Sequence, residues 1–471
     1  MQQPVFDVVK TVGRSVESLI PGRPESARHV LQASYGYVAL TAAFKQTRTY
    51  ANAVNRFNGK IARIIVRALS HPQDTALVNL FLPTQLVDAV GLTPLFPEVL
   101  SAYVGNTACA GCFSEAAESA NVPESLCSYH KVMLGMAQTG VLQAPACIAN
   151  TTVACDANQV SFRDLAERFG VPRFVVDVPN RVNERSVDKV ERRLYELAAF
   201  LERSAGRPFD VDAFLLAMDR TKRTLDALVE YRSLRGGVTM PTSTTGELLE
   251  MLATHLMLGS QAALDFAQDL LHLAKSAPAA HTSSKPRVFW MHTMPNWQRS
   301  MRVAFDGVGA SCELVGNDMT LDALPHIDLT HPMRSLAERA VNTHFNGTGA
   351  RRLENTLEQA QRCGADGVVV FCHWGCKTTL GISQLAKQRF EKAELPTLVL
   401  DGDGCDPRNV ADGQMVTRVN AFVEQLAAQR AKKLASATDG AGAAGAVSAA
   451  GGTRATDEAS SAREPKGGDA R

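Results

Sequence analysis

Ten cysteines are the residues of this 471-residue chain that are best suited to metal or redox chemistry. Thiols stay reduced inside the cell, where they bind metals more often than they form structural disulfides. The chain begins with MQQPVFDVVK, which lacks the basic and apolar stretches of a leader peptide, and it has no run of about 18 apolar residues that could span a membrane. We therefore expect a cytoplasmic protein, with no membrane partner, whose function depends on cysteine.

Cys127 occurs in the segment VPESLCSYHKVMLG, where Pro123, Glu124 and Ser125 lead into a predicted amphipathic helix. Its thiol would lie in the first helical turn, where backbone amides favour negative charge and lower the pKa of a thiol. Such a thiolate can bind a metal. The alternative is a small core cysteine, since cysteine is among the residues most often buried.

Two cysteines lie around the end of a strand predicted at residues 144–150 (APACIAN). Cys155 follows this strand, in a loop before a helix predicted at residues 159–169, and Thr151 and Thr152 could donate hydrogen bonds to its sulfur. Loops at the carboxyl ends of parallel strands line ligand sites, so Cys155 is a candidate metal ligand. Cys147 lies inside the strand and is expected in the core.

Cys372 and Cys376 both occur in FCHWGCKTT, directly after the apolar run GVVVF. Cys376 precedes Lys377, whose positive charge favours a thiolate, and it follows a glycine that lets backbone approach closely. Cys372 adjoins the buried strand and is the candidate for a core position. His373 is a candidate base, with a structural role as the equal alternative.

The remaining cysteines and motifs offer weaker chemistry. Cys109 and Cys112 form one CAGC pair, whereas a zinc ribbon needs two such pairs. No GxxxxGK[ST], HExxH or GxSxG motif is present, which excludes the usual phosphate loop and the common hydrolases. With 49 basic and 48 acidic residues the net charge is +1, so nucleic acid is not an expected partner. The isolated cysteines are expected to be structural: Cys312, Cys363 and Cys405.

Short apolar runs alternate with amphipathic segments in two stretches of the chain. Strands separated by crossover helices form parallel sheets, so the predicted fold class is α/β, with two doubly wound parallel-sheet domains of the flavodoxin or Rossmann type and an additional helical portion. We expect the functional site where the two domains meet. The predicted divisions are an N-terminal helical segment (1–80), a first α/β domain (81–182), a helical segment (183–276), a second α/β domain (277–434) and a disordered tail (435–471).

The middle segment is predicted to be helical from its periodicity, and the tail is predicted to be disordered from its composition. Apolar residues at three- and four-residue spacing predict helices over residues 183–206, 208–235 and 245–275. In the second domain, single helices are predicted to end near Gly364 and to span residues 412–429. The tail is mostly alanine, glycine and serine, so it offers too little apolar surface to offset the entropy of ordering it.

Four segments, taken together, resemble the family of 2-hydroxyacyl-CoA dehydratase and benzoyl-CoA reductase subunits over about residues 80–430. The resemblance rests on their order and spacing as well as on their residues. The segments are PTQLVDAVGLTPLF, VPESLCSYHKVMLG, ANTTVACDANQVSFRDLAERFGVPRFVVDVP and the long stretch that begins CHWGCKTTLGISQLAKQRF.

This resemblance implies one 4Fe-4S cluster, held by three cysteines from a CSxxK-like helix start, a TxxCD-like loop and an SCK-like loop. The matching residues are Cys127 in CSYHK, Cys155 in TVACD and Cys376 in GCK. Gly375 replaces the serine of the third pattern. Cys372 lies close by in sequence and is the alternative third ligand, or a fourth ligand that would close the cluster.

The resemblance also implies the reaction and the partners. Three thiolates leave one iron open to bind a substrate oxygen, and one-electron reduction of the thioester to a ketyl radical lets the 2-hydroxyl of an (R)-2-hydroxyacyl-CoA leave before the β-proton. The implied partners are a homologous second subunit in a heterodimer, a separate ATP-dependent iron–sulfur activator and the acyl-CoA substrate. No catalytic side chain is assigned from the sequence.

Two other functions remain open from the sequence. A subunit similar to benzoyl-CoA reductase would consume electrons in proportion to product, whereas a dehydratase recycles them. A double-cluster electron-transfer protein of the same family is the other alternative, because ten cysteines exceed the three needed for one cluster. Iron and sulfide content separates one cluster from two.

Overall fold

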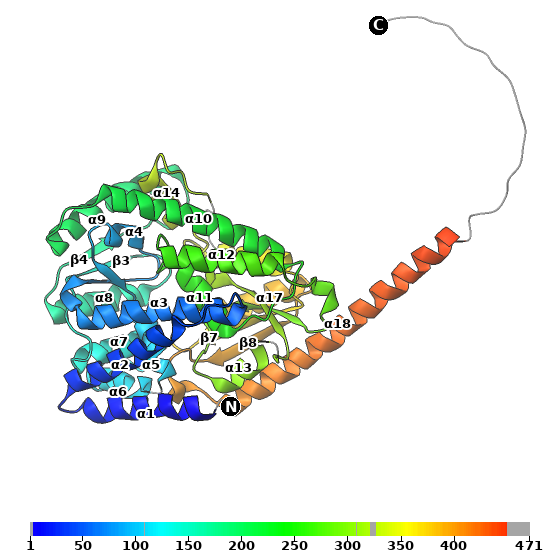
Figure 1. Cartoon of the computed structure of the whole chain (residues 1–471), viewed down its shortest axis with the longest axis horizontal. Helices are drawn as coiled ribbons and strands as arrows, with labels where there is room; N and C mark the ends of the chain where they lie inside the picture. Colours follow the sequence, from blue (N-terminus) through cyan, green and yellow to red (C-terminus); the bar gives the residue numbers. More distant parts are fainter. Residues whose placement is uncertain (1–2, 108, 308, 321–325, 450–471) are drawn as a thin grey trace, which may run out of the picture.

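Two four-stranded parallel sheets form the framework of the computed structural model, which describes residues 3–107, 109–307, 309–320 and 326–449 (Figure 1). This confirms the predicted α/β class. The first sheet has the order β2-β1-β3-β4 and the second has the order β6-β5-β7-β8. The strands are β1 Thr75–Val78, β2 Thr93–Leu95, β3 Cys147–Thr151, β4 Arg173–Val176, β5 Arg287–Met291, β6 Glu313–Asn317, β7 Gly367–His373 and β8 Thr397–Gly402.

The first sheet begins earlier than the predicted boundary at residue 81. Strand β1 lies within the predicted N-terminal helical segment, and its four residues, TALV, are too few to show a strand period. The helices of that segment pack beside the first sheet, and Thr49 caps the third of them by accepting a hydrogen bond from the Asn52 amide. They are α1 Gln3–Leu19, α2 Pro24–Ala42 and α3 Tyr50–Ser70.

The middle segment is helical, as predicted, but its last predicted helix is two helices. The chain turns at Gly259, which has φ +96°, and Ser260 then caps a new helix by accepting a hydrogen bond from the Ala263 amide. The single helix predicted over residues 245–275 is therefore wrong. The four helices are α9 Glu184–Ala205, α10 Val211–Arg235, α11 Thr244–Thr254 and α12 Gln261–Lys275.

The remaining helices connect the strands and cover the sheets. The helix predicted to end near Gly364 is also two helices, since Thr348 starts a new one by accepting a hydrogen bond from the Arg351 amide. These connecting helices are α4 Thr84–Asp88, α5 Pro97–Asn106, α6 Ala110–Ser119, α7 Ser128–Gln138, α8 Asp156–Phe169, α13 Arg299–Phe305, α14 Pro332–Asn342, α15 Gly349–Arg362, α16 Lys377–Leu380 and α17 Ser383–Lys392, with the short 3-10 turn η3 Asp318–Thr320.

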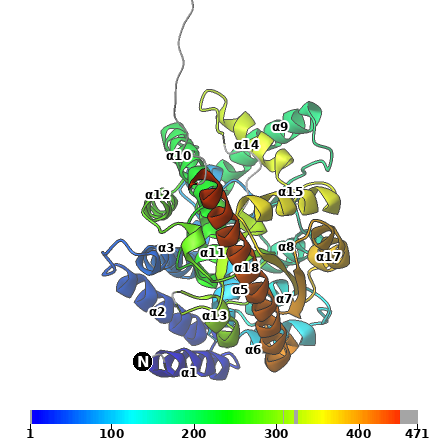
Figure 2. The same ribbon diagram turned by 90° about the vertical axis from the view of Figure 1, so that its right-hand side faces the viewer.

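The last helix, α18 Asp412–Ala449, is longer than predicted. It packs against the second sheet and then projects beyond the body of the molecule (Figures 1 and 2). The predicted tail begins at residue 435, and the backbone of residues 435–449 forms the last part of this helix. The rest of the predicted tail, residues 450–471, lies outside the described residues.

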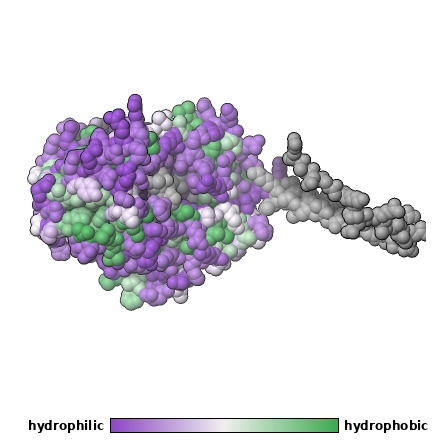
Figure 3. Space-filling view, turned by 90° about the horizontal axis from the view of Figure 1, so that it is seen from above, coloured by the Kyte–Doolittle hydropathy of each residue, from purple (hydrophilic) through white to green (hydrophobic). Residues whose placement is uncertain are grey.

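Apolar residues are buried in one large core and two smaller ones. The large core joins the first sheet to the N-terminal and middle helices, and the smaller cores lie on the two faces of the second sheet. Cys147 is fully buried in β3, as expected. The face seen in Figure 3 is mostly hydrophilic, with apolar patches scattered over it. No helix in the described part of the chain is both long and apolar enough to cross a membrane.

Candidate functional site

The three cysteines predicted to bind a cluster share one structural position, the N-cap of a helix, which Cys109 also occupies before α6. Cys127 precedes α7, Cys155 precedes α8 and Cys376 precedes α16. At such a position unpaired backbone amides carry partial positive charge, which favours a thiolate. The local sequence explains the placement, since each cysteine stands where a loop ends and a helix begins.

These three cysteines line a single cavity of about 990 Å³, a volume that includes the part open to solvent. The cavity lies at the carboxyl ends of both sheets, as predicted: its wall includes Cys155 after β3, Thr293 after β5 and His373 at the end of β7. The two halves of the molecule therefore meet at this cavity.

The three thiols lie close enough to influence one another. Burial, and after it the neighbouring Cys376, raises the pKa of Cys155 to about 12. Burial, then Cys376 and Cys155, raises the pKa of Cys127 well above its usual value. Three thiolates in one buried cavity repel each other unless a cationic centre compensates their charge. The donor set therefore suits a metal centre.

The three thiols do not form a site for one metal ion. Within the described ranges, no three His, Cys, Asp or Glu side chains converge on a position for one metal ion. An iron–sulfur cluster is wider, and each of its cysteines binds a different iron. Thiols that line one cavity from three loops fit such a cluster.

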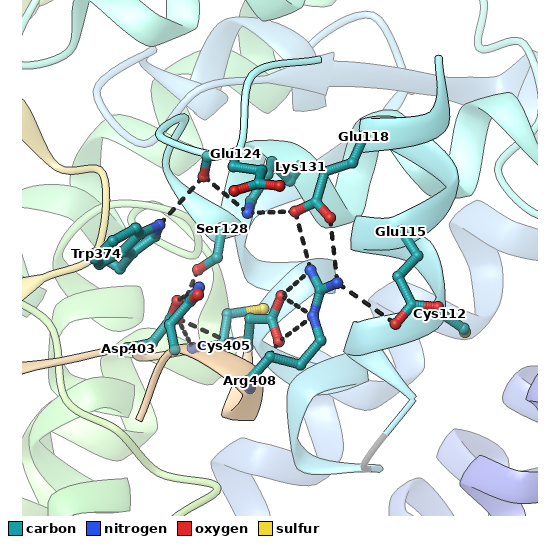
Figure 4. Close-up of polar contacts among 12 residues, drawn as sticks. Cys112, Glu115, Glu118, Glu124, Ser128, Lys131, Trp374, Asp403, Cys405 and Arg408 are labelled. Carbon is teal, nitrogen blue, oxygen red and sulfur yellow. Dashed lines mark hydrogen bonds and ion pairs between the residues drawn. The ribbon is translucent and has the colours of Figure 1, made fainter. Parts of the chain in front are cut away.

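The loop that carries Cys376 is held against the loops of the other two cysteines. Gly375 has φ +76°, and a Cβ built there would lie 2.4 Å from the Cys127 backbone nitrogen. The Thr378 hydroxyl donates to the Ala154 carbonyl at 2.9 Å, next to Cys155. On the other side the Trp374 indole donates to the Glu124 carbonyl at 3.2 Å (Figure 4). These contacts fix the relative positions of the three thiols.

Cys372 does not reach this cavity. Its side chain is buried within β7 and belongs to the core between the second sheet and the helices α15 and α17, with Leu357 and Phe390. Only three residues lie between Cys372 and Cys376, yet the two thiols face different parts of the molecule. Of the two candidates for the third position, only Cys376 lies beside Cys127 and Cys155.

His373 is fixed by hydrogen bonds on both ring nitrogens. Its Nδ1 accepts from the Gly404 amide at 3.0 Å, so in the neutral ring the proton is on Nε2, which lies 3.2 Å from the Cys127 sulfur. Burial, although opposed by Asp403, lowers the pKa of His373 and keeps the ring neutral. His373 therefore donates to sulfur, and the sequence-based suggestion that it is a base is not supported by this geometry.

His130 holds a similar place beside Cys155, and sequence reasoning did not identify it. Its Nε2 lies 3.7 Å from the Cys155 sulfur and its Nδ1 lies 2.8 Å from the Ser161 hydroxyl. Burial, and then the neighbouring His373, lowers the pKa of His130 to about 4. Its place in CSYHK, one helical turn after Cys127, was the available signal.

A polar network braces the segment that leads into Cys127 (Figure 4). Lys131 is almost fully buried, and its Nζ donates to the Glu118 carboxylate at 2.7 Å and to the Glu124 carbonyl at 3.0 Å. Arg408 donates to the same Glu118 carboxylate at 3.0 Å. The Ser128 hydroxyl donates to Asp403 at 2.6 Å. The network ties the start of α7 to the loop after β8.

Glu98 is the one carboxyl group among the described residues that line the cavity. It stands in the first turn of α5, after β2, and its Oε2 is buried without a hydrogen-bond partner among the described residues. Burial raises the pKa of Glu98 to about 7. A partly ionised carboxyl beside three thiols can exchange a proton with a ligand. Glu98 follows strand β2, so the rule that ligand sites form at the carboxyl ends of strands could have identified it from the sequence.

Comparison with known proteins identifies the family of this chain. Residues 79–426 match the family described as 2-hydroxyglutaryl-CoA dehydratase, D-component. Lactoyl-CoA dehydratase subunit alpha of Anaerotignum propionicum is 24% identical over 390 residues, which cover 74% of this chain and 90% of that protein.

Two further relatives carry different acyl groups in their names. (R)-2-hydroxyglutaryl-CoA dehydratase, subunit alpha, of Acidaminococcus fermentans is 24% identical over 301 residues, which cover 59% of this chain and 60% of that protein. The (R)-phenyllactyl-CoA dehydratase alpha subunit of Clostridium sporogenes is 18% identical over 373 residues, covering 74% of this chain and 88% of that protein. Because the family match spans most of the chain, this protein belongs to the 2-hydroxyglutaryl-CoA dehydratase D-component family.

Proposed function

We propose that this chain is the iron–sulfur subunit of a 2-hydroxyacyl-CoA dehydratase, a hydro-lyase that removes water from an (R)-2-hydroxyacyl-CoA. The observation that carries the proposal is the set of three helix-capping cysteines around one mainly apolar cavity. Family membership and the names of the relatives support it.

In this proposal Cys127, Cys155 and Cys376 hold one 4Fe-4S cluster. When bound, a cluster with three cysteine ligands supplies an open iron that acts as a Lewis acid and a centre for one-electron transfer. The Nε2–H of His373 points at the Cys127 sulfur, and hydrogen bonds to ligand sulfur tune a cluster's reduction potential. Cys372 has no role as a ligand here, because its side chain belongs to the core.

The difficult step in this dehydration is removal of a β-proton that is scarcely acidic. One-electron reduction of the thioester to a ketyl radical anion lets the 2-hydroxyl leave, and the β-proton of the resulting radical is far more acidic. Glu98 accepts that proton in our proposal. Its carboxyl has an unpaired oxygen in the cavity and a pKa of about 7, raised by burial, which suits proton transfer near neutral pH.

The cavity wall protects such chemistry from water. Apolar side chains such as Phe96, Val99 and Leu252 surround the few polar groups. A low-polarity site excludes solvent, which prevents a reactive radical from being quenched.

The proposal includes partners that this chain does not contain. A homologous second subunit would form a heterodimer with it, since the relatives are named as alpha subunits. An ATP-dependent iron–sulfur activator would supply the electron, and the acyl-CoA would be the substrate. We place the protein in the cytoplasm, where ten cysteines would stay reduced.

Electron stoichiometry tests the reaction. The chain is co-purified anaerobically with its second subunit and mixed with the activator, ATP, a reductant and a 2-hydroxyacyl-CoA. The proposal predicts many 2-enoyl-CoA molecules per electron supplied. Two electrons consumed per product would instead indicate a reductase of the benzoyl-CoA type, and no conversion of any 2-hydroxyacyl-CoA would contradict the dehydratase.

A further inference from the structure

The part of the cavity wall that lies outside the cysteine loops is mostly apolar. Helix α11 contributes Leu248, Met251 and Leu252, and neighbouring segments add further aliphatic and aromatic side chains. These are Phe81, Phe96, Val99, Met319 and Phe345. The acyl side chain of a bound thioester would meet this surface.

The described part of the wall holds one cationic side chain, and it is already ion-paired with a carboxylate, although its Nη2 makes no hydrogen bond. Arg352 is the one arginine or lysine among the described lining residues, and it is almost fully buried. Its Nε and Nη2 lie 2.8 Å and 2.7 Å from the Asp318 carboxylate, and its Nη1 donates to the Thr379 hydroxyl at 3.1 Å. Its guanidinium also stacks on Phe345, 4.7 Å from the ring centroid.

The remaining ionisable groups do not favour an anion. Glu98 is acidic, and its carboxylate would repel a second carboxylate. Both ring nitrogens of His373 and of His130 already have protein partners, and burial lowers the pKa of His292 and keeps that ring neutral. A carboxylate at the end of an acyl chain would therefore lose its hydration without gaining an ionic partner.

We propose that this cavity selects a 2-hydroxyacyl-CoA whose acyl side chain is uncharged, apolar and larger than a methyl group, and that it rejects a dicarboxylic acyl group. The inference rests on the proposed function and narrows it. The family is described by a dicarboxylic substrate, whereas its relatives are named for glutaryl, lactoyl and phenyllactyl groups, so membership alone does not fix the acyl group.

The expected discrimination follows from two physical effects. A phenyl or branched alkyl group buries several more carbons than a methyl group, and each carbon that fits an apolar pocket is worth about fourfold or more in binding. An unpaired carboxylate loses its hydration, which is expected to weaken binding by about 100-fold or more. The cavity therefore prefers phenyllactyl over lactoyl, and lactoyl over 2-hydroxyglutaryl.

Equilibrium binding to the resting enzyme tests this order without turnover. The cluster-loaded complex is titrated anaerobically, in the absence of activator, with (R)-phenyllactyl-CoA, (R)-lactoyl-CoA and (R)-2-hydroxyglutaryl-CoA. We expect phenyllactyl-CoA to bind at least about 10-fold more tightly than lactoyl-CoA and about 100-fold more tightly than 2-hydroxyglutaryl-CoA. Equal affinities, a preference for 2-hydroxyglutaryl-CoA, or no binding of any of the three would overturn the inference.

A variant with a positive charge in the cavity wall tests the same inference. Leu248 is half-buried at the cavity, so Leu248→Lys is expected to strengthen binding of 2-hydroxyglutaryl-CoA by about 10-fold or more and to weaken that of phenyllactyl-CoA. Leu216→Lys is the control, because Leu216 is 49% exposed on α10 and is not a lining residue. If Leu248→Lys does not fold, Leu248→Ala is used, which should weaken phenyllactyl-CoA binding and leave lactoyl-CoA binding unchanged. An unchanged order of affinities in a folded variant would contradict the inference.

This experiment separates the two proposals. If the binding order holds but the activated complex converts none of the thioesters, the dehydratase proposal fails while the selectivity of the cavity stands. If dehydration occurs but 2-hydroxyglutaryl-CoA is preferred, the reaction stands and the acyl class is wrong.

Discussion

At the scale of single residues, Cys372 and Cys376 show how four positions separate a core thiol from a site thiol. Cys372 is 2% exposed within β7, and burial raises the pKa of its thiol to about 11. Cys376 caps α16 and lines the cavity with Cys127 and Cys155. The Cys372 thiol belongs to the core that contains Phe390, so it could bind a cluster in the cavity only if strand β7 were refolded.

We expect Cys376→Ser to lose the cluster or most of its iron, and Cys372→Ser to retain it. Serine keeps the size of the side chain and removes the thiolate, so iron content reports ligation rather than packing. The checks are anaerobic iron analysis and visible absorption of both variants. The opposite pattern would transfer the ligand role to Cys372, and loss of iron in both would put the open iron site in doubt.

Glu98→Gln tests the proposed proton acceptor. Glutamine has nearly the same shape but cannot take the β-proton, so dehydration should fall by about 100- to 10,000-fold while iron content stays unchanged. Glu124→Gln is the control, since Glu124 is exposed on the segment before Cys127 and its side chain does not line the cavity. Glu98→Gln activity within threefold of wild type would exclude this role.

Residue patterns predicted some of these roles and missed others. Cys127, Cys155 and Cys376 could be singled out because each stands next to a helix start or a strand end, and the structure brings all three to one cavity. Glu98 and His130 could not be identified from the sequence. Glu98 stands out because one of its buried oxygens has no hydrogen-bond partner, and His130 because it lies beside the Cys155 sulfur, and both features depend on tertiary packing.

At the scale of elements, the β7–α16 loop positions the third thiol by approaching the Cys127 backbone. Gly375→Ala would add a Cβ 2.4 Å from the Cys127 nitrogen, at a φ of +76° that already disfavours a side chain. We expect a loss of more than about 2 kcal/mol in unfolding free energy, with reduced iron content, because the two cysteine loops must move apart.

Gly170→Ala is the matched control for that change. Gly170 also has positive φ, +63°, but a Cβ there would meet nothing within 4 Å. Its cost should be about 1 kcal/mol, with iron content unaffected. Urea denaturation and iron analysis of both variants make the comparison. Equal iron contents in the two variants would show that the close approach does not position the cluster ligands.

Helices with a long apolar periodicity were predicted correctly. A short strand and the helix boundaries that depend on local capping were not. The long helices α9 and α10 follow from their apolar spacing, whereas β1 has too few residues to show a period. The break between α11 and α12 depends on the positive φ of Gly259 and on the Ser260 cap, and the prediction of one continuous helix did not take these two features into account.

At the scale of the whole molecule, buried neutral histidines make stability depend on pH. His255 is a clear case outside the cysteine loops: its Nε2 donates to the Met319 carbonyl at 3.1 Å, and its Nδ1 lies 3.3 Å from an Arg339 nitrogen. Burial, followed by the charge of Arg339, lowers the pKa of His255 well below its usual value. The unfolded chain therefore takes up a proton below about pH 6.5 that the folded chain refuses.

The sign of this effect is a loss of stability as pH falls. Between pH 7.5 and 5.5 the wild type should lose about 1.4 kcal/mol more unfolding free energy than His255→Gln, which cannot be protonated. Anaerobic urea denaturation at the two pH values measures the difference. His29→Gln is the control, since His29 is exposed on α2, and the pH dependence of this variant should match that of the wild type. An identical pH dependence in His255→Gln would contradict this account.

The architecture of the whole molecule was predictable because crossover connections dictate parallel sheets. The same rule placed ligand-binding loops at the carboxyl ends of the strands, where Cys155 and Cys376 are found. The extent of α18 was not predicted, because its last residues are mostly alanine, glycine and serine, and this composition alone indicated disorder.

In our proposal this chain holds one 4Fe-4S cluster on three cysteines. Iron and acid-labile sulfide are measured on anaerobically purified wild-type chain. We expect about four irons and four sulfides per chain. About eight of each would indicate a double cluster, and absence of iron with zinc bound in its place would indicate a structural metal protein; either result would contradict the account.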